Sequence, residues 1–235
     1  MRGYGSEIGN FPCRAATIVW LLPGAQREEI LMTIFTPGNI AALIIAASFA
    51  AGLNVYATVL TLGLLARLHG VVLPPGLEVL ASWWVIAVSG VMFALEFVAD
   101  KIPGFDMIWN ALHTFIRVPV AALLAYQASG QLSPEMKLLA ALAGAAIALV
   151  AHGSKTAVRA AVTPSPEPVS NIALSTGEDV VAVGITWLTT QHPWAAAAIA
   201  AMLIVCAMVA ARWMVRLLRG IWKRAQAGSA AIERR

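Results

Sequence analysis

The longest uncharged stretches of this sequence are too long for the interior of a water-soluble domain. No Asp, Glu, Lys or Arg occurs in the 37 residues from Ile30 to Ala66 or in the 32 residues from Val180 to Ala211. A helix that crosses a bilayer needs about 20 apolar residues. Charged residues make up only 12% of the chain, against about 25% in soluble domains. The chain is therefore predicted to be an integral membrane protein, and its composition argues against a soluble enzyme, a disordered protein or a nucleic-acid-binding domain.

Shorter uncharged stretches and turn residues divide the rest of the chain. The ranges 79–95, 118–134 and 138–154, each 17 residues long, also lack Asp, Glu, Lys and Arg. Ile102-Pro103-Gly104 separates two of these stretches, and the three prolines in Thr163–Pro168 cannot continue a helix. We predict an all-α, polytopic helical membrane protein with about six membrane helices, some of them broken or re-entrant. The predicted helices lie near 40–67, 79–99, 107–127, 137–154, 171–190 and 194–218.

The same pattern predicts the domain boundaries. Residues 1–35 are expected to be a disordered leader or to precede the functional start at Met32, because the apolar run Ala15–Leu22 is too short to span a membrane. Residues 36–218 are expected to form a single helical membrane domain, and residues 219–235 a basic tail.

Orientation is predicted from the basic residues. Seven Lys or Arg residues and one acid follow Ala211. Such residues accumulate on the cytoplasmic side of membrane helices, so we expect a multi-pass protein of the cell inner membrane with a cytoplasmic C-terminus. Six spans would place the N-terminus on the same side. An odd number of spans, or helices 107–127 and 171–190 that enter and return, would also fit.

The basic tail and the apolar helices indicate the partners. Arg212, Arg216 and Arg219 follow a helical spacing next to Trp213, which is typical of a helix that leaves the bilayer at its interface. The expected partner is the lipid bilayer, together with an anionic lipid or a small charged solute. No nucleic acid is expected, and the oligomeric state cannot be read from the sequence.

Charges that lie away from the helix ends are the functional candidates. An ionisable group at membrane depth costs at least ~2.5–3.5 kcal/mol on insertion scales, so such groups should face the bundle interior and pair with one another. Several are spaced one helical turn apart and therefore share a helix face. The candidate ion-binding or substrate-binding residues are Glu96, Asp100, Lys101, Asp106, His113, Arg117, His152, Lys155, Arg159, Asn171, Glu178 and Asp179.

Two interpretations of these charges compete. They can form interhelical salt bridges that fix how the helices pack, or they can line a polar cavity for an ion or a charged headgroup. Both signs of charge, two histidines and the helix breaks converge on one region, which favours the cavity for the cluster as a whole. Arg117 and Glu178 are the strongest candidates because each lies well inside its helix. For His113 alone, a structural role is equally favoured.

A helix break is the second candidate feature. Gly52, Asn54 and Tyr56 interrupt the first predicted helix near its middle. Broken helices expose backbone groups to substrate in many transporters. A kinked helix that packs through its small residues explains the segment equally well.

The charged positions also carry a family resemblance. The runs LEFVADKIPGFDMIWNALHTFIRVPVAALLA and AHGSKTAVRAAVTPSPEPVSNIALSTGED resemble the bacterial membrane family labelled domain of unknown function 4126. The resemblance covers roughly residues 38–190. One departure from the family pattern is Val118, which separates Arg117 from Pro119. The resemblance implies a membrane protein and supplies no activity. The positions that match the family pattern are Glu96, Asp100-Lys101-Ile102-Pro103, Asp106, His113, Arg117, His152-Gly153, Lys155, Arg159, Ser165-Pro166-Glu167-Pro168 and Glu178-Asp179.

Known cofactor and metal motifs do not occur in the sequence. It contains no phosphate-binding glycine loop, no dinucleotide fingerprint and no His-Glu-x-x-His or Cys/His metal spacing, so we expect no cofactor and no metal site. A role without enzymatic activity is favoured, and an enzyme stays open as an alternative. The preferred function is transport or channel-like conduction of an ion or small charged solute. The alternatives are a structural or accessory membrane subunit, and a flippase or enzyme that binds lipid headgroups.

Overall fold

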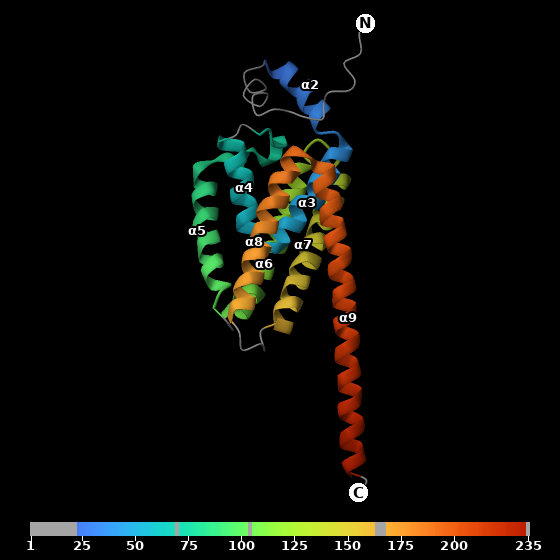
Figure 1. Ribbon diagram of the computed structural model, residues 1–235. Coiled ribbons are helices and arrows are strands. Elements are labelled where there is room, and N and C mark those ends of the chain that lie inside the picture. The colour runs from blue at the N-terminus through green and yellow to red at the C-terminus, as the bar shows by residue number, and fades with distance from the viewer. Residues whose placement is uncertain (1–22, 69–70, 103–104, 163–167, 234–235) are drawn as a thin grey trace.

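The computed structural model describes residues 23–68, 71–102, 105–162 and 168–233, and every regular element in these ranges is a helix (Figure 1). The predicted all-α membrane fold is confirmed. The elements are α2 (Gly24–Ile34), α3 (Pro37–Leu53), α4 (Val55–Leu68), the 3-10 helix η1 (Pro75–Ala81), α5 (Trp83–Ala99), α6 (Phe105–Ala128), α7 (Pro134–Val162), α8 (Pro168–Gln191) and α9 (Pro193–Glu233).

Prolines and capping side chains set where these helices begin. The Thr36 hydroxyl accepts a hydrogen bond from the Asn39 backbone N–H at 3.3 Å and so caps α3. Pro134, Pro168 and Pro193 are the first residues of α7, α8 and α9, where proline loses no helical hydrogen bond. The breaks predicted from the sequence are therefore the helix starts of the structure.

A single residue breaks the first predicted membrane helix. Asn54 has an extended backbone (φ −149°, ψ 103°) between α3 and α4. Its side-chain oxygen accepts a hydrogen bond from the Ala57 backbone N–H at 2.9 Å, so Asn54 ends one helix and caps the next.

The two arms of this break run in opposite directions. α3 runs parallel to α7, because Ser48 lies against Gly144 and, further along, Gly52 lies against Ala148. α4 returns towards the end where α3 began, since Gly63 lies against Leu80 of η1. The segment that follows stays at that end of the bundle, where α6 ends and α7 begins. α3 and α4 therefore form a re-entrant hairpin, and the prediction of one membrane helix over 40–67 is wrong.

The five later helices pass along the bundle in alternating directions. They lie close to the predicted ranges, although α7 and α9 continue beyond them. The helices predicted at 107–127 and 171–190 do not return, because α6 and α8 are each continuous. Three helices are long and apolar enough to cross a membrane, or up to five if each bent pair counts as one span.

This arrangement changes the predicted topology. The start of α3 and the end of α9 lie at opposite ends of the bundle (Figure 1). From α3 onward this arrangement fits the odd number of spans that the sequence also allowed, because the hairpin replaces one crossing. Of the predicted leader, residues 1–22 lie outside the described residues, and 24–34 form α2.

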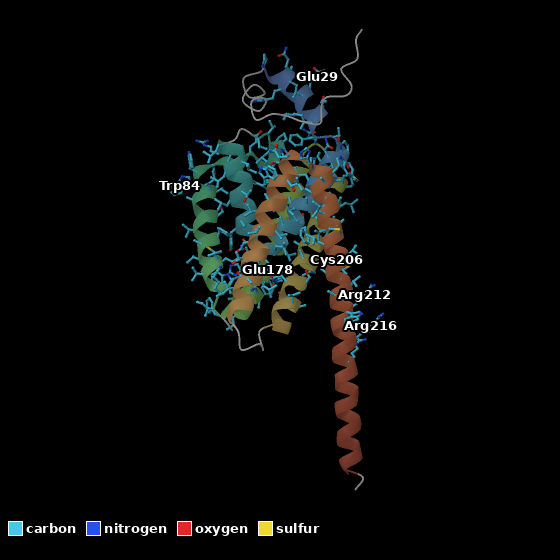
Figure 2. All side chains as sticks on the ribbon, in the orientation of Figure 1. Glu29, Trp84, Glu178, Cys206, Arg212 and Arg216 are labelled. Atoms are coloured by element: carbon cyan, nitrogen blue, oxygen red, sulfur yellow. The ribbon has the colours of Figure 1, made fainter. Side chains whose placement is uncertain are left out.

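The outer surface of the bundle is apolar. Trp84 on α5 and Phe115 on α6 are 83% and 81% exposed, and Val180 on α8 is also exposed. Trp84 points away from the bundle in Figure 2. Apolar surface of this extent is typical of contact with lipid, which agrees with a multi-pass membrane protein.

The centre of the bundle is α3. It packs against α6, α7, α8 and α9, and its alanines at 42, 46, 50 and 51 have no exposed surface. Small residues let membrane helices approach closely. The tight packing around α3 positions the tip of the hairpin inside the bundle.

Candidate functional site

The tip of the hairpin meets a group of ionisable side chains from four helices. We call this group the charged cluster. Its members are buried or largely buried, and Figure 2 labels Glu178 on α8. They are Glu96 on α5, Asp100 at its C-terminal cap, Arg117 on α6, Lys155 on α7, and Glu178 and Asp179 on α8.

Arg117 forms the centre of one half of the cluster. One terminal nitrogen, Nη2, donates to Glu96 Oε1, and neither side chain has exposed surface. The other, Nη1, donates to Asn110 Oδ1 at 3.1 Å and to His152 Nδ1 at 2.7 Å. Asn110 Nδ2 in turn donates to Asp100 Oδ1 at 3.3 Å. Both terminal nitrogens of Arg117 are thus engaged by protein groups.

Lys155 forms the centre of the other half. Its Nζ lies 3.1 Å from Asp100 Oδ2, 3.2 Å from Glu178 Oε2 and 3.9 Å from Glu96 Oε1. It also donates to the backbone carbonyl of Leu53 at 3.1 Å. Leu53 is the last residue of α3, and helix C-terminal carbonyls carry partial negative charge. The ammonium therefore occupies a site built from oxygen atoms only.

Asn54 connects the helix break to α8. Its Nδ2 donates to Asp179 Oδ1 at 2.8 Å, while its Oδ1 caps α4 through Ala57. Asn54 has no exposed surface, and Asp179 is 5% exposed. One side chain thus ties the hairpin tip to an acid of the cluster.

His152 has a defined tautomer. An arginine can only donate hydrogen bonds, so Nδ1 of His152 is the acceptor for Arg117. Its Nε2 lies 2.7 Å from the Thr114 hydroxyl, which donates to the Asn110 carbonyl at 3.2 Å. Nε2 therefore carries the hydrogen, and His152 is neutral with both nitrogens engaged.

Several buried polar atoms have no hydrogen-bond partner among the described residues. The acceptors are Glu96 Oε2 and Asp179 Oδ2, and the Ser175 hydroxyl one turn before Asp179 is also unpartnered. The nitrogens are Trp109 Nε1, His113 Nε2 and Arg117 Nε. An unsatisfied buried polar group costs about 1–3 kcal/mol. These atoms are therefore the positions at which binding of a ligand, a proton or water is most favourable.

Two acids of the cluster each have one buried oxygen, Glu96 Oε2 and Asp179 Oδ2, without a partner among the described residues. A buried carboxylate oxygen in this state is unfavourable unless a proton or a positive charge joins it. These two oxygens are therefore suited to bind a proton or a cation.

A protein-family model, described as domain of unknown function (DUF4126), matches residues 41–213. The chain belongs to this family. The resemblance expected from the sequence motifs is confirmed, and the DUF4126 domain contains the whole charged cluster and the hairpin tip. No curated protein and no solved structure matches the chain.

The structure brings most of the predicted site residues of the DUF4126 domain together. Besides the cluster members, His113 and His152 are buried beside Arg117. Lys101 lies apart and partly exposed, where its Nζ donates to the Phe97 carbonyl at 3.0 Å and lies over the Phe97 ring. The side chains of Asp106, Arg159 and Asn171 lie outside the described part of the chain.

The three break residues of the DUF4126 domain have different surroundings. Gly52 contacts Ala148 so closely that an added Cβ would lie 2.6 Å from its carbonyl oxygen. Asn54 faces the cluster, and the Tyr56 ring meets the edge of the His113 ring at 5.7 Å. Gly52 thus agrees with a packing role, whereas Asn54 and Tyr56 face the polar interior.

Sequence reasoning missed two polar groups that organise the cluster. Asn110 joins Arg117 to Asp100, and Thr114 joins His152 to the same network. Asn110 precedes Arg117 by two helical turns, so its spacing could have revealed a shared face. The Leu53 carbonyl could not have been found, because it is available only where the helix breaks. Among the described residues, no group of three or more His, Cys, Asp or Glu is placed to hold a metal ion.

Proposed function

We propose that this protein transports a proton or a small cation across the membrane through the charged cluster. The observation that carries the proposal is the meeting of the re-entrant hairpin tip with buried acids. The Leu53 carbonyl and the Asn54 side chain each bond directly to a member of the cluster, at 3.1 and 2.8 Å. Transporters commonly place ion sites where a discontinuous helix exposes its ends inside the membrane.

The buried polar atoms that lack a hydrogen-bond partner favour a positively charged substrate. The terminal nitrogens of Arg117 and the ammonium of Lys155 are already held by protein oxygens and by His152. By contrast, two buried carboxylate oxygens, Glu96 Oε2 and Asp179 Oδ2, have no hydrogen-bond partner among the described residues. A phosphate headgroup would have to displace these carboxylates, so the same geometry argues against a lipid-headgroup flippase or enzyme.

Lys155 supports the same assignment in another way. Its ammonium lies among a helix C-terminal carbonyl and carboxylate oxygens, which is the oxygen-rich environment that a cation requires. A proton or cation that enters the cluster would neutralise part of the carboxylate charge and weaken the ion pairs of Lys155. Because Lys155 also bonds to the Leu53 carbonyl, weaker ion pairs would allow the hairpin tip to move when an ion binds.

The test is ion flux into liposomes that contain the purified protein. Gradients of H⁺, Na⁺ and K⁺ are imposed one at a time, with a fluorescent indicator for each ion. We expect protein-dependent flux of one of these ions, and we expect Asp179→Asn and Glu96→Gln to abolish it. Glu78→Gln and Glu135→Gln are matched controls, because both acids are exposed and lie outside the cluster. Absence of flux for all three ions, or unchanged flux in both cluster variants, would refute the proposal.

Closed ion pairs favour a structural role as the second candidate. Arg117 with Glu96, and Lys155 with Asp100, are complete pairs that join α6 to α5 and α7 to α5. If these pairs only hold the helices together, either single change, Glu96→Arg or Arg117→Glu, should lower the stability of the protein. The double variant, in which the two charges are exchanged, should restore it. Restored stability together with an absence of ion flux in the wild type would establish the structural role.

A further inference from the structure

His113 lies beside the charged cluster and takes no part in the ion pairs described above. It is 4% exposed and precedes Arg117 by one turn of α6. Its ring stacks on the Trp109 ring, with centroids 4.3 Å apart and planes 27° apart. The Tyr56 ring of α4 meets it edge-on at 5.7 Å. Two aromatic contacts from different helices thus fix the orientation of the imidazole.

The hydrogen-bond partners of His113 determine which nitrogen carries the hydrogen. Nδ1 lies 2.8 Å from the backbone carbonyl oxygen of Trp109. A carbonyl oxygen can only accept a hydrogen bond, so Nδ1 carries the hydrogen and donates it. In the neutral imidazole, Nε2 is then a basic nitrogen with a free lone pair. This Nε2 is buried and has no partner among the described residues.

His152 is the natural comparison, because it has the opposite tautomer. Arg117 donates to its Nδ1, and its Nε2 hydrogen goes to Thr114. Protonating His152 would put a hydrogen on the atom that faces the guanidinium, and would break that bond. Protonating His113 at Nε2 breaks no existing bond. Of these two histidines, only His113 is built to accept a proton.

We propose that Nε2 of His113 is a proton-binding site, and that the ion carried through this protein is therefore a proton. The inference deepens the proposed transport function and rests on it. In the binding step a hydronium ion loses a proton to Nε2: its O–H bond breaks, an N–H bond forms, water leaves, and the imidazole becomes an imidazolium. Nδ1–H continues to donate to Trp109, so the ring stays in place in both states.

The surroundings of His113 determine whether such a charge is tolerated. Tyr56 from α4 contacts the His113 ring, and Arg117 follows His113 by one turn of α6. Arg117 in turn bonds to Glu96 from α5 and to His152 from α7. α3, which also packs on α6, holds no ionisable residue. Arg117 opposes a second positive charge, but Glu96 pairs with it and keeps one carboxylate oxygen unpartnered. Glu96 therefore offsets the positive charge of Arg117.

The first test is the protonation state of each histidine in the wild-type protein. Histidine labelled with ¹⁵N reports separately on Nδ1 and Nε2 by NMR in lipid nanodiscs, with signals assigned from His113→Asn, His152→Asn and His192→Asn. We expect His113 to show the Nδ1–H tautomer at high pH and to gain a second proton at Nε2 as pH falls through the range in which flux is measured. His152 should keep its Nε2–H tautomer over that range. A His113 that stays neutral throughout would overturn the inference, even if a variant fails to fold.

The second test is proton flux in liposomes. Asn keeps a donor at the position of Nδ1 and lacks a basic nitrogen, so His113→Asn should lower proton flux on the order of 10²-fold, the lower end of what a positioned proton-transfer group contributes. His192→Asn is the matched control, because His192 is exposed in the turn before α9. If His113→Asn retains wild-type proton flux while Asp179→Asn loses it, the histidine inference fails and the transport proposal stands. If the wild type moves no ion, the transport proposal fails as well.

Discussion

Lys155 Nζ donates a hydrogen bond of 3.1 Å to the backbone carbonyl of Leu53, so a side chain of α7 caps the broken end of α3. A helix that ends inside an apolar bundle leaves carbonyl groups without helical partners. In water such groups would be solvated, but Leu53 is only 8% exposed. Lys155 satisfies this carbonyl and is itself neutralised by Asp100 and Glu178. The helix break and the charged cluster are therefore mutually dependent.

Removing the Lys155 charge should destabilise the whole bundle. Lys155→Met keeps the length and apolar stem of the side chain but removes the ammonium that Asp100, Glu178 and the Leu53 carbonyl share. Breaking a buried ion pair in this way costs roughly 3–5 kcal/mol. Unfolding in mild detergent, followed by circular dichroism, measures the loss. Lys137→Met is the matched control at a partly exposed position and should change stability by less than about 0.5 kcal/mol. Equal effects of the two substitutions would contradict the dependence of the break on Lys155.

Asn54 should be sensitive to the loss of its donor group even when its acceptor oxygen is retained. Asn54→Asp retains the oxygen that caps α4 but places a carboxylate against Asp179 Oδ1, in place of the present 2.8 Å hydrogen bond. Two ionised carboxylates repel, and the repulsion disappears when one of them binds a proton.

Asn54→Asp should therefore be less stable than the wild type at neutral pH and should regain stability as pH falls. Asn54→Ala loses both hydrogen bonds, including a cap worth about 0.5–2 kcal/mol, and its deficit should not decrease at low pH. Thermal unfolding of the three proteins over a series of pH values distinguishes them. A deficit in Asn54→Asp that is independent of pH would show that Asn54 does not contact Asp179.

Much of the fold follows from the sequence because charge content and proline positions report directly on membrane helices. The positions of α5 to α9 and the buried charges at Glu96, Arg117 and Lys155 were predictable on that basis. The hairpin was not, since both of its arms are apolar and a single extended residue, Asn54, reverses the chain. Hydropathy indicates which residues lie within the membrane, but it does not indicate the direction in which the chain runs there. The hydrogen-bond partners of the cluster, such as Asn110, depend on how helices pack and so required the structure.

Gly52 should be intolerant of even one added methyl group. A Cβ at this position would lie 2.6 Å from the Ala148 carbonyl oxygen and 2.7 Å from Ala151 Cβ, both on α7. Gly52→Ala should push α3 away from α7, separate Leu53 from Lys155 and cost about 1–3 kcal/mol, as overpacking typically does. Gly153→Ala on α7 is the control, because nothing lies within 4 Å of its Cβ position. The control should be neutral or slightly stabilising. A stable Gly52→Ala protein would contradict the close contact of α3 with α7.

Re-entry of the α3–α4 hairpin predicts which surface positions share a side of the membrane. Glu29 precedes the hairpin, Glu78 follows it, and both are exposed. If the hairpin returns, cysteines introduced as Glu29→Cys and Glu78→Cys should react with a membrane-impermeant maleimide from the same side. Arg216→Cys, on the exposed part of α9, should react only from the opposite side. The labelling uses sealed vesicles of known orientation, in a background in which Cys13 and Cys206 are replaced by Ser. Labelling of Glu29→Cys and Glu78→Cys from opposite sides would mean that α3 and α4 together cross the membrane, and the hairpin would then be wrong.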